Sequence, residues 1–171
     1  SALLRLQSRR SDLESVQAAL KEAERRVQAI ATVHEALSQD VNEQVDFDDV
    51  ARTIVRMAGT LASTDHAVDV TTTGEFGSLA AAQAQAMATV LNELVSNSVE
   101  HGLADKDGLI RVHAQRNGDQ LGAGIQPGRA MTGLGTQIVN QMVRGELRGS
   151  IDWEPAEGGG TIVTLKARLS D

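Results

Sequence analysis

Four polar side chains recur on one side of a predicted helix in the middle of the chain. Glu93, Asn97, Glu100 and His101 stand at positions i, i+4, i+7 and i+8, so an α-helix brings them to a common face. Carboxylate and amide oxygens suit Mg²⁺, which keeps several of its waters, and a histidine at the end of the stripe can reach a phosphate. An ordinary solvated helix face has the same pattern, so the stripe alone leaves both interpretations open.

Two glycine pairs follow the stripe, Gly-Ala-Gly at 122–124 and Gly-Leu-Gly at 133–135. The second pair opens a predicted helix, where the unpaired backbone N–H groups and the helix dipole both favour an anion such as a phosphate. Glycine pairs also form ordinary turns, so each pair is a weak signal by itself.

Alternating helices and strands would position these residues. The stripe lies on a helix predicted over residues 79–101, and Asp46 is predicted to cap an earlier helix whose apolar positions recur as far as Leu61. Alternating apolar and polar residues predict strands. The predicted strands cover residues 67–73, 109–116, 147–153 and 161–169, and a further helix covers residues 133–144. Helices on one face of a mixed sheet make an α+β fold, a two-layer α/β sandwich.

The first forty residues form a separate helical unit in this prediction. Apolar positions alternate in steps of three and four, which is typical of a bundle helix, and Ser11 with Glu14 forms a capping box where that helix begins. The preceding residues 3–6 then end another helix, which gives an antiparallel hairpin. Two hairpins dimerising into a four-helix bundle would bury the seam, although a hairpin packed on the rest of the chain would also do so. The seam consists of Leu13, Val16, Leu20, Ala23, Val27, Ile30, His34 and Leu37. We expect a hairpin domain over residues 1–40 and a sandwich domain over residues 41–171.

The composition limits the partners. There are 16 Lys and Arg residues against 23 Asp and Glu residues, and the net charge of -7 leaves no basic field for nucleic acid or for direct membrane contact. Cysteine is absent, which is compatible with a reducing cytosol, and no apolar run approaches the ~20 residues of a membrane span. We therefore expect a soluble, cytoplasmic piece, whose parent protein could still be membrane-bound.

One local pattern conflicts with these predictions. Asn117-Gly118 at the end of an alternating segment predicts a hairpin turn and so requires a return strand. Only residues 119–121 precede the first glycine pair, which is too few to pair with the strand before the turn. We infer from the sequence that a strand of several residues is missing here.

Four motifs in this order resemble the nucleotide-binding fold that DNA gyrase shares with histidine kinases. They are the asparagine-containing run at 93–101, Gly-Ala-Gly at 122–124, Gly-Leu-Gly-Thr at 133–136, and Gly-Gly-Gly-Thr at 158–161. Residues 3–10 and 25–35 further resemble the HisKA_2 class of bacterial sensor histidine kinases. The resemblance implies ATP and Mg²⁺ as cofactors, a homodimer formed through the hairpin, and transfer of phosphate from a histidine to the receiver domain of a response regulator.

The resemblance also implies roles for individual residues. Asn97 would hold Mg²⁺, Glu93 would order water or metal beside it, and His101 would approach the phosphates. The second glycine motif would close over the triphosphate, the first would belong to the adenine box, and Thr161 would lie near the adenine. The glycine-motif residues concerned are Gly122, Gly124, Gly133, Leu134, Gly135 and Thr136.

The chain departs from the family pattern in three places. Gln120 stands where the family has the Asp that accepts from the adenine amino group, with Asp119 one residue out of register. The lid between Gly124 and Gly133 is short, so we expect residues to be missing there as well. The acceptor histidine should precede residue 1, since His34 occupies a packed seam position. These departures leave open the alternative that the chain is a pseudokinase, which binds partners without catalysing phosphoryl transfer. An anti-sigma-type kinase of the same superfamily is a third possibility, against which the N-terminal hairpin argues.

Overall fold

A computed structural model describes most of the second part of the chain. The described residues are 44–60, 67–99, 103, 107–126, 134–157 and 160–169, together with positions 13, 16, 17, 20, 23, 24, 27 and 31, which lie on an N-terminal helix. The first helix of the expected hairpin and its turn lie outside these residues. Within the described part, no helix is long and apolar enough to cross a membrane.

Five strands form the main sheet, in the spatial order β2-β4-β5-β7-β6. Only the β2–β4 pair is parallel, and the other neighbours are antiparallel. This mixed pairing confirms the predicted sheet type. The strands are β2 (Val68–Gly74), β4 (Gly108–Asn117), β5 (Gln120–Gln126), β6 (Ser150–Pro155) and β7 (Thr161–Arg168).

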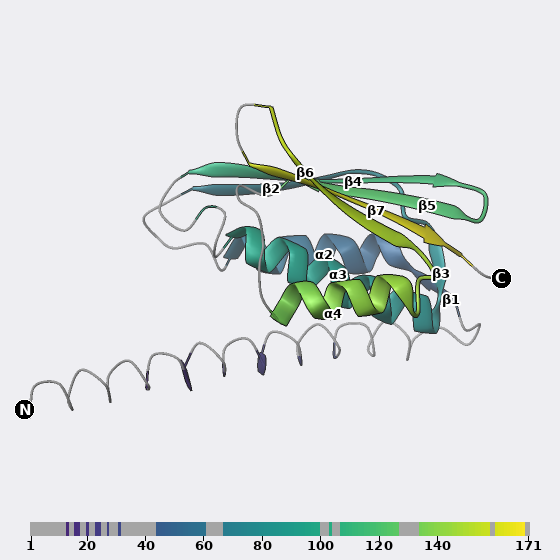
Figure 1. Ribbon diagram of the computed structural model, residues 1–171, viewed down its shortest axis with the longest axis horizontal. Helices are drawn as coiled ribbons and strands as arrows, with labels where there is room; N and C mark the ends of the chain where they lie inside the picture. The colour runs from purple at the N-terminus through teal and green to yellow at the C-terminus, as the bar shows by residue number, and fades with distance from the viewer. Residues whose placement is uncertain are drawn as a thin grey trace, which may run out of the picture.

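Three helices cover one face of this sheet: α2 (Phe47–Thr60), α3 (Ala81–Asn97) and α4 (Leu134–Arg144) (Figure 1). No described element covers the other face. A small two-stranded sheet pairs β1 (Gln44–Asp46) with β3 (Ser78–Ala80) at the edge of the helical layer. The arrangement is a two-layer α/β sandwich and confirms the predicted fold class.

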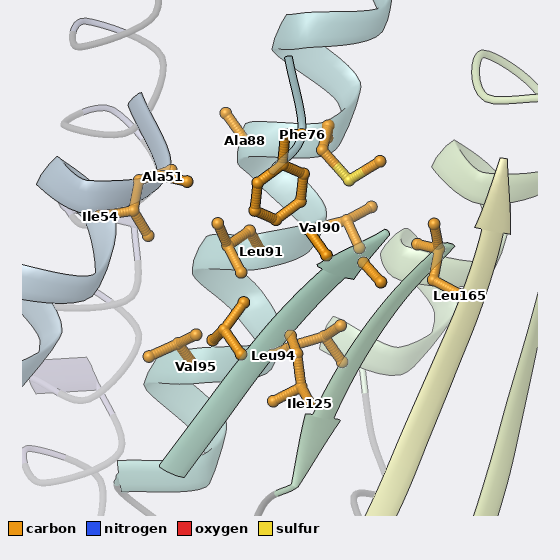
Figure 2. Packing of buried hydrophobic residues seen from close by; sticks show 14 of the residues in the cluster. Ala51, Ile54, Phe76, Ala88, Val90, Leu91, Leu94, Val95, Ile125 and Leu165 are labelled. Atoms are coloured by element: carbon orange, nitrogen blue, oxygen red, sulfur yellow. The ribbon is translucent and has the colours of Figure 1, made fainter. Parts of the chain in front are cut away.

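The core fills the space between the two layers. Figure 2 shows Phe76, Leu91 and Leu94 directed towards the sheet residues Ile125 and Leu165. The ring of Phe76 also meets the ring of Phe47 edge to face, with centroids 5.1 Å apart. Complete burial of such a side chain contributes about 1.5–3 kcal/mol, so this cluster holds helices and sheet in one arrangement.

Polar contacts fix the loop between β2 and β3 against the sandwich. Asp46 accepts a hydrogen bond from the backbone N–H of Asp48 at 3.1 Å, which confirms the predicted cap of α2. The carboxylate of Asp48 in turn accepts from the N–H groups of Phe76 and Gly77, both at 2.9 Å. On the other side, Arg116 donates to the carbonyl oxygens of Phe76 and Ser78. The loop is therefore tied to both α2 and β4.

The inference of a missing strand is wrong. β5 follows β4 after the two-residue turn Gly118-Asp119, in which Gly118 has a φ of 60°, and Asn117 pairs with Gln120. Both glycines of the first pair lie inside this strand. The hairpin prediction itself is confirmed, and the segment that contains the first glycine pair supplies the return strand.

The other differences concern element boundaries and two short strands. β1 and β3, of three residues each, were not predicted. β6 begins at Ser150 and not at residue 147, because Leu147 is buried in the turn after α4. α3 ends at Asn97, and residues 98 and 99 follow it as a wider π-type turn. Glu100 and His101 lie outside the described residues.

Candidate functional site

Glu93 and Asn97 lie one turn apart near the carboxyl end of α3 and differ in exposure. The side chain of Glu93 is only 3 % exposed, whereas Asn97 is half-buried. A carboxylate on an ordinary solvated helix face would be open to water, so the burial of Glu93 rules out that alternative for this residue. Glu93 also has an interaction partner in the structure.

The helix ends immediately after these two residues. The hydroxyl of Ser98 donates to the carbonyl oxygen of Leu94 at 2.5 Å, and the chain then passes through the π-type turn. Such π-type turns are rare and occur often at functional sites. Asn97 is thus the last residue of α3 and stands at one end of the helical layer.

Two hydrogen bonds show that α4 begins at this same end. Gln83, near the start of α3, donates to the carbonyl oxygen of Arg168 at the end of β7. The N–H of Arg168 donates to the carbonyl oxygen of Leu147, just after α4. The start of α3 and the end of α4 therefore meet at one end of the sandwich. Figure 1 shows that the two helices run in opposite directions, so the carboxyl end of α3 and the start of α4 lie together at the other end. These helix ends are Asn97 and Leu134.

Thr161 belongs to the same end of the molecule. It is the first residue of β7, whose last residue, Arg168, lies beside the start of α3. Its side chain is 6 % exposed and lies on the helix-facing side of β7, with Val163 and Leu165. The structure thus gathers four of the expected site residues, Glu93, Asn97, Thr136 and Thr161, at one end of the sandwich.

The structure separates the first glycine pair from this group. Gly122 and Gly124 lie in the central strand β5 and pair with both β4 and β7. Their neighbours Leu121, Ala123 and Ile125 point into the core, so the two glycine positions belong to the face of the sheet that carries no helix. The first glycine pair, which we expected in the adenine box, thus lies within a strand and on the face of the sheet away from Glu93. Gln120, at the expected adenine-box position, lies on that same outer face.

Several expected residues lie outside the described part of the chain. These are His101, Gly133, Gly158, Gly159 and His34; for Leu134 and Gly135 only the helical backbone is described. Gly133 immediately precedes α4, which is consistent with a glycine motif that opens this helix. The first turn of α4 exposes backbone N–H groups at the end of the sandwich where Asn97 lies.

The side chains at this end suit a magnesium ion that also holds phosphate. The described residues contain no cluster of three or more His, Asp or Glu side chains that could enclose a metal on their own. Mg²⁺ commonly takes only one or two protein oxygens and completes its shell with phosphates and water. The buried carboxylate of Glu93 and the amide of Asn97 provide that type of donor set.

The family models match two adjoining parts of the chain. The model described as "Histidine kinase", HisKA_2, matches residues 1–62, and the model described as "Histidine kinase-, DNA gyrase B-, and HSP90-like ATPase" matches residues 82–171. The second match covers more than half of the 171 residues, including α3, α4 and β7.

Two curated relatives are similar over almost the entire chain. The sensor histidine kinase PdtaS of Mycolicibacterium smegmatis is 38 % identical over 181 residues, which cover 99 % of this chain and 36 % of that protein. PdtaS of Mycobacterium tuberculosis is 37 % identical over 178 residues, covering 97 % of this chain and 36 % of that protein. This chain therefore spans about a third of the length of these relatives. The first alignment has 181 positions against 171 residues here, so at least ten of its positions have no residue in this chain.

Solved structures share the fold. The blue-light activated histidine kinase of Erythrobacter litoralis EL346 superposes with a TM-score of 0.71 at 19 % identity, covering 88 % of this chain and 55 % of that one. Its histidine kinase domain gives a TM-score of 0.67 at 20 % identity, with 85 % and 74 % covered. The AdeS histidine kinase of Acinetobacter baumannii gives 0.60 at 16 % identity, with 93 % and 84 % covered. With the family match over residues 82–171, the chain belongs to the histidine kinase-, DNA gyrase B- and HSP90-like ATPase family.

Proposed function

We propose that this chain is the catalytic core of a two-component sensor histidine kinase. In this proposal residues 41–171 bind ATP with Mg²⁺, and residues 1–40 form the hairpin for dimerisation and phosphotransfer. The phosphoryl group passes to a histidine and then to the receiver domain of a response regulator. The family membership and the PdtaS relatives support this assignment.

The observation that carries the proposal is the position of Glu93 and Asn97 relative to α4. A buried carboxylate and a half-buried amide lie one turn apart at the end of the sandwich where α4 begins. A metal held by Asn97 and Glu93 and a phosphate held by the first turn of α4 would then be neighbours. We assign Thr161 to the adenine side of the site and the second glycine motif and His101 to the phosphate side. Gly122 and Gly124 are left out of this proposal, because they lie in β5 on the face of the sheet that carries no helix.

Phosphoryl transfer requires mainly positioning and charge neutralisation from the protein. When bound, Mg²⁺ supplies charge neutralisation on the phosphate oxygens. The amide of Asn97 would hold the metal, and the buried carboxylate of Glu93 would hold water or metal beside it. The N–H groups at the start of α4 orient the phosphate chain without any proton transfer.

The acceptor histidine in this proposal is not His113. That histidine lies in β4 at an exposed position, with its Nδ1 atom 3.0 Å from the hydroxyl of Thr73 in β2. Its neighbours Val112 and Ala114 point into the core, so His113 lies on the face away from α3 and α4. A group on that face cannot meet a phosphate held at the start of α4.

The exposed seam of the N-terminal helix supports a homodimer. Leu13, Val16, Leu20 and Val27 are 62 %, 55 %, 64 % and 65 % exposed in the single chain. Large apolar side chains repeated along one helix at this exposure are stabilised by a second copy of the helix. We place the protein in the cytoplasm, where ATP and response regulators are available.

Nucleotide binding to the purified chain tests the proposal. We expect saturable ATP binding by calorimetry that requires Mg²⁺ and that Asn97→Ala weakens by roughly tenfold or more, since a charge-assisted contact is lost. Asn92→Ala is the matched control, because Asn92 is also half-buried on α3 but lies on a different side of the helix. Equal binding by the wild type and Asn97→Ala would contradict the assignment of the site.

A second candidate is a pseudokinase whose sandwich recruits partners without using ATP. Gln120 lies on the outer face of the sheet, away from α3, and the chain lacks at least ten positions of its relative. The position of Gln120 favours loss of adenine recognition. A dimer that binds no nucleotide with Mg²⁺ present would support this candidate against the first.

A further inference from the structure

A groove lies on the outer face of the sheet, at the end opposite the proposed nucleotide site. It has a volume of about 490 Å³ and is formed where β4, β5 and β7 meet the turn after α4. In Figure 1 the β4–β5 hairpin and the chain end lie at the end of the sandwich away from the start of α4. The polar side chains that line it are Gln115, Asn117, Gln120, Arg148, Lys166 and Arg168.

The charge of this groove is opposite to that of the chain. Acidic residues outnumber basic ones by 23 to 16 in the whole sequence, yet the groove is lined by three basic residues and by no Asp or Glu. Within the described part of the chain, Arg148, Lys166 and Arg168 form no ion pair with a carboxylate. Three cations that line one groove repel one another, and an anion bound between them would reduce that repulsion.

The register of the strands shows how the groove is formed. Gly122 pairs with Gln115 of β4 on one side and with Lys166 of β7 on the other. Because Gly122 has no side chain, the floor of the groove is bare backbone between two rows of side chains about 9–10 Å apart, twice the spacing of neighbouring strands. Lys166 and Arg168 are two residues apart on β7 and therefore point to the same side.

The backbone that carries the third cation, Arg148, lies in a tightly packed turn. Arg148 has a φ of 46°, a backbone conformation that is uncommon for residues other than glycine. The next residue, Gly149, donates its N–H to the carbonyl oxygen of Val143 at 2.8 Å. A Cβ atom at Gly149 would lie 1.9 Å from the carbonyl oxygen of Lys166, so this turn is pressed directly against β7. The backbone of Arg148 is thus fixed at the rim of the groove.

We propose that this groove is a binding site for a small phosphorylated anion, separate from the Mg²⁺-dependent site at the start of α4. Three cations match the two to four negative charges of a phosphate monoester or a pyrophosphate better than the single charge of a carboxylate. The volume lies within the ~300–1,000 Å³ typical of small-molecule sites. The amides of Gln115, Asn117 and Gln120 add donors and acceptors that could contact the group attached to the phosphate.

Pyrophosphate binding to the full chain without divalent metal tests the proposal. We expect saturable binding by calorimetry in about 150 mM salt, near physiological ionic strength. The double variant Lys166→Gln/Arg168→Gln should weaken it by roughly tenfold or more, because two charged donors are lost. Both side chains are exposed, so the variant should keep the thermal unfolding midpoint of the wild type.

Two further variants show where the anion binds. Arg111→Gln removes an exposed cation from the outer face of β4 that does not line the groove, and binding should be retained. Asn97→Ala alters the other end of the sandwich and should also retain it. No saturable binding to the wild type, an equal loss in Arg111→Gln, or a loss in Asn97→Ala would each overturn the proposal. Binding of a glutamate-rich peptide in place of pyrophosphate would overturn it too.

The source of the phosphate is decided by comparing three probes on the wild type. Tighter binding of AMP than of inorganic phosphate or pyrophosphate would identify a nucleotide held also through the amides of Gln115 and Asn117. Equal or tighter binding of pyrophosphate would identify an inorganic or simple phosphorylated ligand. Both outcomes support a phosphate site, and neither depends on whether the chain proves to be an active kinase.

Discussion

At the scale of single residues, Glu93 and Asn97 differ in burial and therefore suit different roles. The carboxylate of Glu93 is nearly inaccessible to solvent. The half-buried amide of Asn97, one turn later, can contact a ligand that arrives from solution. The spacing of these residues predicted a shared face from the sequence alone. It could not predict which of the two would be buried, because that depends on how α3 packs against α4 and the sheet.

Substitution of Gly124 and of Gly149 by alanine gives a prediction at the same scale. A Cβ at Gly149 would lie 1.9 Å from a backbone oxygen of β7, so Gly149→Ala should lower the free energy of unfolding by about 1–3 kcal/mol, measured by urea denaturation. At Gly124 the closest atom would be 3.9 Å away, an ordinary contact, so Gly124→Ala should be tolerated.

The Gly124→Ala variant has a second use. Since Gly124 lies on the outer face of the sheet, we expect ATP binding with Mg²⁺ to be the same in this variant and in the wild type. A loss of nucleotide binding in a folded Gly124→Ala protein would restore the original interpretation of the first glycine pair. A stable Gly149→Ala protein would contradict the close packing of the turn after α4.

At the scale of elements, the sequence predicted those with a clear period and failed where glycine obscured it. The period of 3.6 identified α2, α3 and α4, and alternation identified β2, β4, β6 and β7. In β5 the inward residues Leu121, Ala123 and Ile125 also alternate. Glycine at the outward positions disfavours a strand by propensity, so the local sequence does not predict this strand. Pairing on both sides with β4 and β7 stabilises the strand despite that propensity.

The residues that line the groove could be predicted from the sequence only in part. Lys166 and Arg168 could have been placed on one face of the predicted strand from their spacing of two. Gln115 and Arg148 come from other parts of the chain, and only the order of the strands brings them together. Strand order depends on contacts between segments far apart in sequence, which local periodicity does not encode.

The tie between α2 and the loop at 75–77 gives a prediction at this scale. Asp48→Ala removes the acceptor of two backbone N–H groups in a partly buried position, so we expect unfolding to become easier by about 1–3 kcal/mol. Asp49→Ala is the matched control in the same first turn of α2. Its carboxylate pairs with Arg52 at an exposed position and raises the pKa of that guanidinium, mainly through their hydrogen bond. Urea denaturation of Asp49→Ala should show little change, and equal losses in the two variants would contradict the tie.

At the scale of the whole molecule, two ends of one sandwich carry different chemistry. The end where α3 stops and α4 starts has a buried carboxylate and helix N–H groups. The opposite end has a groove lined by Arg148, Lys166 and Arg168, which form no ion pair among the residues that the structure describes. α4 (Leu134–Arg144) leads from the first site towards the turn that holds Arg148. The fold class could be predicted from the sequence because local patterns determine layers. The separation of the two sites could not be predicted from the sequence, because it depends on which face of the sheet each side chain of β5 lies on.

The N-terminal helix gives the last prediction, which concerns assembly. Leu20 is 64 % exposed in the single chain and lies in the apolar seam with Val16 and Val27. In a dimer it would be buried, so Leu20→Asp should weaken self-association by roughly 30-fold or more, as expected when a buried leucine contact is lost. Sedimentation velocity over a range of concentrations measures this change.

The matched control for assembly is Glu24→Gln, an exposed position on the same helix outside the seam. It should leave the dimer intact, because a single exposed charge contributes little to such an interface. The sandwich should unfold at the same temperature in Leu20→Asp as in the wild type, since its core lies in α2, α3, α4 and the sheet. If Leu20→Asp remained as dimeric as Glu24→Gln, or if the wild type stayed monomeric, the exposed seam would have to be covered by another part of the chain or by a different protein.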